Sequence, residues 1–139
     1  MKLSLNVKVI GKYIDINLTE NEIIKYTLDM EPPHPLDTES SFDGIIKLQG
    51  NISYMLEHSP YELQAIREWW SEREFVGDDI YNFVEISIKQ EGKIIRTKTF
   101  HNACINNYTE DIDTNSGQDI FNLELKPKLN KKEWPNLMF

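Results

Sequence analysis

Alternation of apolar and polar residues along several short segments is the feature that most constrains the fold of this chain. In residues 3–9, leucine and valine occupy every second position, and polar residues stand between them. Successive side chains of a strand point to opposite faces, so this period of two predicts strands that bury one face. The segments that we expect to be extended are 3–9, 14–18, 24–30, 44–54, 84–88, 94–99, 100–108 and 121–125.

Turn residues separate these segments. Gly11-Lys12 interrupts the first alternation and predicts a hairpin with the strand that follows. Glu91-Gly92 fits a two-residue hairpin turn. The stretch from Glu31 to Asp43 contains three prolines and few apolar residues. We expect a long loop there, because proline removes donors from a strand ladder.

One clear helix signal begins at Ser59. Ser59, Pro60 and Glu62 match a capping box, in which the serine hydroxyl accepts from a free backbone N–H and the glutamate reaches back to the cap. Apolar residues follow at helical spacing, so the helix is amphipathic and covers an apolar surface. We expect it to span residues 60–73.

These elements together predict the architecture. Strands outnumber helices, and the order of elements lacks the alternation of strand and helix that builds a parallel sheet. We therefore expect a mainly β fold, a small antiparallel β-barrel made of two packed sheets, with one amphipathic α-helix covering an opening or a face. The 139 residues are enough for a single domain with a substantial core, which we expect to span residues 1–139.

Composition excludes several classes of function. The chain has 15 basic and 23 acidic residues, a formal net charge of −8, and its basic residues are scattered among acidic ones. A protein that follows nucleic-acid phosphates normally has a basic face, so we expect no nucleic-acid binding. No apolar run is long enough for a membrane span, and the alternating first residues differ from a signal peptide. With a single cysteine, Cys104, we expect a protein made in a reducing cytoplasm.

No group of residues matches a catalytic, cofactor-binding or metal-binding motif. The acidic stretch 111–119 resembles a calcium loop but lacks the glycine and glutamate that an EF-hand needs, so we interpret it as a polar turn. His101 and Cys104 are three residues apart on an expected strand and would face opposite sides, which argues against a nucleophile and its base. Catalytic residues, cofactors and metals are therefore not expected.

Trp69 and Trp70 permit two interpretations. Adjacent helical residues point about 100° apart, so one ring can belong to the core while the other lies at a rim and contacts a partner protein. The pair can also form a stacking platform for a sugar, in a monomeric β-barrel that binds a small ligand. A small hydrolase that uses His101 with a carboxylate is a further alternative.

The C-terminal two-thirds of the chain resembles a known family. Residues 94–117, followed by 120–126, are similar to the last strands of the Hcp (TssD) tube proteins of type VI secretion and to phage tail tube proteins. The resemblance covers residues 44–135 and includes the single helix. Its matching features are Phe100 with Ala103, Tyr108 with Glu110 and Asp113, the turn Asn115-Ser116-Gly117, the strand 121–125 and Trp134-Pro135.

The resemblance implies a structural role without enzymatic activity or cofactors. Such a subunit forms hexameric rings that stack into the inner tube of a contractile injection apparatus, with sheath, spike or baseplate proteins as partners. It implies assembly in the cytoplasm and later export or ejection with the apparatus, without membrane insertion. A baseplate or adaptor protein of the same apparatus is the alternative within this class. The residues that we expect at subunit or ring interfaces are Pro33, Pro35, Asp37, Glu39, Trp69, Phe100, Tyr108 and Trp134.

Overall fold

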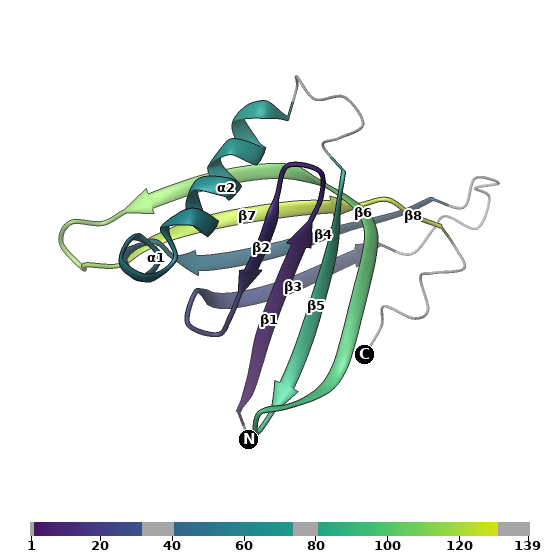
Figure 1. Cartoon of the computed structure of the whole chain (residues 1–139), viewed down its shortest axis with the longest axis horizontal. Helices are drawn as coiled ribbons and strands as arrows, with labels where there is room; N and C mark the ends of the chain where they lie inside the picture. Colours follow the sequence, from purple (N-terminus) through teal and green to yellow (C-terminus); the bar gives the residue numbers. More distant parts are fainter. Residues whose placement is uncertain (1, 32–40, 74–80, 131–139) are drawn as a thin grey trace.

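The computed structural model of the chain describes residues 2–31, 41–73 and 81–130. These residues form eight strands and two helices (Figure 1). In chain order the elements are β1 (Leu3–Ile10), β2 (Asp15–Leu18), β3 (Ile23–Glu31), β4 (Ser41–Asn51), α1 (Ile52–His58), α2 (Pro60–Glu72), β5 (Asn82–Gln90), β6 (Lys93–Ile112), β7 (Asp119–Pro127) and β8 (Leu129–Asn130).

Seven of these strands form one continuous antiparallel sheet in the order β2-β1-β5-β6-β7-β4-β3, and β8 pairs with the start of β4 outside this path. The 20-residue strand β6 joins the two halves of the sheet, because residues 93–103 pair with β5 and residues 103–112 pair with β7. Figure 1 shows β1, β2 and β5 in one layer, β3, β4 and β7 in another, and the curved β6 passing between them. The mainly β prediction is therefore confirmed, but the two expected sheets are halves of a single rolled sheet.

The apolar faces of the two layers meet in one core. Every strand from β1 to β7 and both helices contribute buried side chains to it. Complete burial of an aliphatic or aromatic side chain contributes about 1.5–3 kcal/mol, so this core is the main source of stability. Its largest apolar side chains with under 2% exposure are Leu18, Ile46, Leu48, Ile52, Met55, Leu63, Ile66, Ile86, Phe100, Phe121 and Leu123.

Two predicted hairpins are confirmed by strand register and turn geometry. β1 pairs with β2 with Val9 opposite Ile16, so the alternating apolar residues share one face. Glu91 and Gly92 both have positive φ, at 53° and 79°, as a tight two-residue hairpin turn between β5 and β6 requires. The alternation of apolar residues and the turn residues therefore predict both hairpins correctly.

Asn51 ends β4 and begins a helix that the sequence did not predict. Its side-chain oxygen accepts a hydrogen bond from Tyr54 N at 3.1 Å, which is the bond of an N-cap. Residues 52–54 are therefore the first turn of α1, and the prediction of a strand as far as Tyr54 is wrong for these three positions. The expectation of a single helix is corrected to two.

The second helix, α2, begins at the predicted residue and ends one residue before the predicted end, but its predicted cap is absent. Ser59 makes no side-chain cap bond, and its hydroxyl instead donates to Glu22 Oε1 at 2.9 Å. Pro60 in the first turn and the amphipathic pattern remain as the local signals that fix the start. α2 contacts β2 and β6, and α1 contacts β7, so the helix pair bridges the two layers (Figure 1).

Candidate functional site

Three of the residues expected at a subunit interface lie in the core of their own chain. Phe100 is fully buried, and Trp69 and Tyr108 are 7% and 9% exposed. A buried side chain has little surface to offer a neighbouring subunit, so the structure places these residues in the core of the chain. The other five expected interface residues lie outside the described residues; they are Pro33, Pro35, Asp37, Glu39 and Trp134.

Tyr108 belongs to a polar cluster that fixes α2 to β6. Its hydroxyl donates to Glu110 Oε2 at 2.5 Å. The Glu110 carboxylate also accepts from Arg67 Nε at 2.7 Å and from Arg67 Nη2 at 2.8 Å, a two-point charge-assisted contact. The hydrogen bonds from Arg67 lower the pKa of Glu110 despite its partial burial, and burial together with the bond to Glu110 raises the pKa of Tyr108. The cluster is therefore structural.

The two tryptophans of α2 have different surroundings. Trp69 is buried in the core, and Trp70 is half-buried. The Arg73 guanidinium lies 3.5 Å from the centroid of the Trp70 ring, and Arg73 Nη1 donates to the Trp70 carbonyl oxygen at 2.6 Å. One ring is in the core and the other stacks with a cation. The two rings therefore do not form the exposed platform that a sugar-binding module would need.

His101 and Cys104 lack the arrangement of a catalytic pair. The His101 ring is exposed and lies edge-on to Phe83, with 5.7 Å between ring centroids. Cys104 is half-buried, and its thiol lies 3.7 Å from the Lys126 carbonyl oxygen. Burial raises the pKa of this thiol, whereas a nucleophilic cysteine needs a lowered pKa. These surroundings do not support a nucleophile–base pair of Cys104 and His101.

The acidic stretch 111–119 forms the polar turn that its sequence predicts. Asp113 Oδ1 accepts from Asn115 N at 2.9 Å and from Ser116 N at 3.2 Å, and the Asp113 carbonyl accepts from Gly117 N at 3.0 Å. These oxygens therefore bond to their own backbone. Within residues 2–31, 41–73 and 81–130, no group of three or more histidine, cysteine or acidic side chains is placed to hold a metal ion.

Glu22 connects the short β2–β3 turn to the helices. Its carboxylate accepts from Thr19 N at 3.0 Å, from the Thr19 hydroxyl, and from the Ser59 hydroxyl. Its backbone oxygen accepts from Asn51 N at 2.8 Å. Burial alone would raise the pKa of Glu22, but these hydrogen bonds outweigh it and lower the pKa below its usual value. The ionised carboxylate therefore holds the α1–α2 junction beside the point where the chain enters β3.

The ends of the rolled sheet leave strand edges without a partner among the described residues. β3 is the last strand of the path and pairs with β4 on one side only. At the other end, β2 pairs with residues 7–10 of β1 and leaves residues 3–6 uncovered on that side. Unpaired N–H and C=O groups along an edge can pair with another strand. These two stretches, β3 and residues 3–6 of β1, are called the free edges below.

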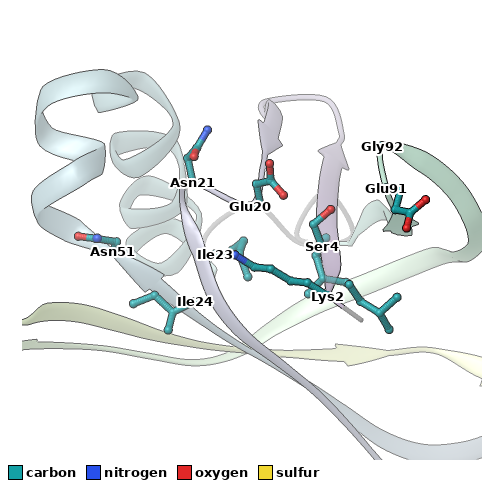
Figure 2. Close-up of a pocket in the computed structure, with 11 residues that line it drawn as sticks. Lys2, Ser4, Glu20, Asn21, Ile23, Ile24, Asn51, Glu91 and Gly92 are labelled. Carbon is teal, nitrogen blue, oxygen red and sulfur yellow. The ribbon is translucent and has the colours of Figure 1, made fainter.

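The start of β3 and residues 3–5 of β1 border a cavity of about 700 Å³. Residues 2–5 line one side of it and Ile23 and Ile24 line the other, with the β5–β6 turn and the start of α1 at its margins. Figure 2 shows the Lys2 side chain extending across this opening toward Ile23. Neither tryptophan of α2 lines it. The roll is therefore open along one seam, and the opening is bounded by backbone that can accept a strand.

A row of polar side chains crosses the outer face of β4, β7 and β6. Gln49 Nε2 donates to Asn122 Oδ1 at 3.0 Å, and Asn122 Nδ2 donates to Asp111 Oδ2 at 3.1 Å. Beside this row, Lys47 and Asp29 form an ion pair at 3.1 Å. The outer face of this half of the sheet is thus built for contact with water, as expected for an antiparallel sheet with one buried face.

Sequence reasoning missed the free edges. The segments that became β1 and β3 were recognised from alternation, but alternation does not say which strands are neighbours in the sheet. A partial signal existed, because the second segment of the first hairpin is short and covers only part of its partner.

Among the residues described, no helix has the length and apolar character needed to cross a membrane.

Comparisons with known proteins identify a similar fold but no sequence family. No protein-family model and no curated protein matches the chain. Among solved structures, the chain is similar to one in the sixfold-symmetrised cryo-EM structure of the anti-feeding prophage (AFP) baseplate. The TM-score is 0.53 with 16% sequence identity, and the similarity covers 92% of this chain and 93% of that chain. The two chains therefore share a fold over nearly their whole length.

Proposed function

We propose that this chain is a structural subunit of a contractile injection apparatus. The observation that carries the proposal is the fold shared with a chain of the AFP baseplate over 92% and 93% of the two lengths. Similarity across whole chains is more informative than a shared hairpin, since it includes the rolled sheet and its helices. The resemblance of residues 94–126 to tube proteins points to the same class of machine.

The more specific role that we propose is a subunit of hexameric rings that stack into a tube. The free edges support this role, because the unpaired edge of β3 in one copy can pair with residues 3–6 of β1 in the next copy. Such contacts use two different surfaces on each copy, and they close into a ring when the rotation between copies permits. The polar row on the outer sheet face suits a subunit that borders a water-filled channel.

A baseplate or adaptor subunit of the same apparatus is the second candidate, and the comparison favours it specifically, since the similar chain belongs to a baseplate. The two candidates differ in self-assembly. A tube subunit stacks on further copies of itself, whereas an adaptor forms one ring and needs other proteins on either side. Sheath and spike proteins are the partners we propose in both cases.

Neither role requires a bond to be made or broken, and we propose that the chain is not an enzyme and needs no cofactor. The raised pKa of the Cys104 thiol and the exposed, edge-on position of His101 support this. We further propose assembly in the cytoplasm, followed by ejection with the apparatus.

Hydrogen exchange, read together with particle mass, tests the proposed use of the free edges. Light scattering of the purified protein at increasing concentration should give particles of about six times 16.4 kDa, or larger multiples. In those particles the amides of β3 and of residues 3–6 should exchange more slowly than in the dilute monomer. The matched control is β7, which has a strand on both sides and should show little change. Particles whose β3 amides exchange at the monomer rate would contradict pairing through the free edges.

A further inference from the structure

The tip of the β5–β6 hairpin exposes large apolar side chains beside lysines. Ile94 and Ile95 are 60% and 54% exposed. Lys93 is exposed next to them, and Lys89 lies opposite Ile94 in the strand pairing. Neither lysine forms an ion pair with a residue in the described ranges. We call these four residues the hairpin tip; together with the exposed Glu91 of the turn, two positive charges and one negative charge surround its apolar centre.

A recess with two acidic residues at its margin lies between α2 and the β1–β2 turn, where Lys12 Nζ also lies 5.3 Å from the centroid of the Tyr13 ring. Its volume is about 40 Å³, slightly more than the ~30 Å³ share of one water molecule in the liquid, so only the end of a side chain can enter. Glu68 and Glu72, one helical turn apart on α2, are exposed at its margin, and the exposed Tyr13 ring lies across from them. We call this site the helix recess; its lining is Tyr13, Ile14, Ala65, Glu68, Trp69, Glu72 and Asn82.

We propose that the hairpin tip of one copy docks into the helix recess of a second copy. This inference rests on the proposed function and names one contact between subunits. The recess has room for the end of one isoleucine side chain of the tip, and the two lysines face the two glutamates at its margin. Apolar burial supplies affinity in such a contact, while the charges fix orientation and reject wrong partners.

The two surfaces cannot meet within one chain. Figure 1 shows the β5–β6 turn close to the N-terminus at one end of the molecule and α2 at the other. A contact between unlike surfaces on successive copies is head-to-tail and repeats from copy to copy. It also opposes the long-range repulsion that a net charge of −8 imposes, because the positive charges of the tip meet acidic residues.

Charge reversal on each side tests the docking. The tip variant carries Lys89→Glu and Lys93→Glu, and the recess variant carries Glu68→Lys and Glu72→Lys. Each variant alone should associate with itself at least about tenfold more weakly than the wild type, measured by sedimentation equilibrium. A 1:1 mixture should recover association, because the acidic tip of one variant meets the basic recess of the other and the basic tip meets the acidic recess. Recovery in the mixture also shows that both variants are folded.

The matched control reverses two exposed strand lysines away from both surfaces, Lys8→Glu and Lys126→Glu, which changes the net charge as much as the tip variant does. It should associate like the wild type. If both charge-reversal variants assemble normally, or if the mixture recovers nothing, the docking is overturned while the proposed function stands. A wild-type chain that stays monomeric at every concentration overturns both. Binding of the tip only to another protein of the apparatus overturns the choice of a second copy.

Discussion

Arg67 and Glu110 attach α2 to β6 through two parallel hydrogen bonds. We expect Arg67→Met to lower the free energy of unfolding by about 1–2 kcal/mol, because it leaves a partly buried carboxylate without its charge partner. The cost is below that of a fully buried pair, since the Arg67 side chain is 38% exposed. Urea unfolding at pH 7 measures it. The matched control is Lys47→Met, which removes the exposed pair with Asp29 and should cost less than about 0.5 kcal/mol.

The Arg67→Met penalty should also depend on pH. The pKa of Glu110 is lowered from 4.5 in the folded chain, so the folded state binds its proton less readily than the unfolded state does. The stability from this pair is therefore fully present above about pH 4.5 and is lost as pH falls through the lower, folded-state pKa. The urea unfolding curves of the wild type and of the Arg67→Met variant should therefore converge at low pH. A penalty that is equal at pH 7 and in acid would show that lost packing, and not the ion pair, causes it.

Local sequence signals could not identify the partners of single polar residues. The motif at Ser59 predicted a hydroxyl that caps α2, yet this hydroxyl donates to Glu22, which is 37 positions away in the sequence. The capping motif is defined by spacing within a few residues, so it contains no information about a carboxylate that the fold brings near. By contrast, the Asp113 turn was predictable, because all of its hydrogen bonds are made within five residues.

At the scale of elements, the approach of β4 to β7 depends on Gly50. Gly50 pairs with Phe121, and a Cβ atom on it would lie 1.9 Å from Phe121 Cε2. Gly50→Ala should therefore lower the free energy of unfolding by about 1–3 kcal/mol, because the ring must shift within a packed core. Phe121→Leu should relieve part of this cost, so the double variant should be more stable than the sum of the single changes implies. Strictly additive costs in denaturant unfolding would contradict the contact.

Most strands were predictable from alternation, and the failures have a common cause. Residues 52–54 continue the alternation of β4, but the Asn51 cap and burial of Ile52 and Met55 among the helices favour a helix there. The two predicted segments 94–99 and 100–108 are one strand, because β6 exchanges partners from β5 to β7 without interruption. The start of α1 and the continuity of β6 both depend on how the elements pack and pair. The local alternation of residues gives no information about this.

At the scale of the whole molecule, the sequence predicted the class of fold better than the site. The family motifs predict Phe100 and Tyr108 at an interface, but both residues lie on the buried face of β6. A motif marks residues that matter for the fold or for function and does not distinguish the two. The surfaces that suit association are instead the free edges and the hairpin tip, which become visible only when strand pairing and exposure are known.

Electron microscopy of the purified wild-type protein in negative stain tests the central claim, that this chain is a ring-forming structural subunit, most directly. The proposed function predicts rings of constant diameter with sixfold symmetry, either single or stacked into tubes. A sample that contains only particles of the 16.4 kDa chain, at every concentration up to the solubility limit, would contradict the claim.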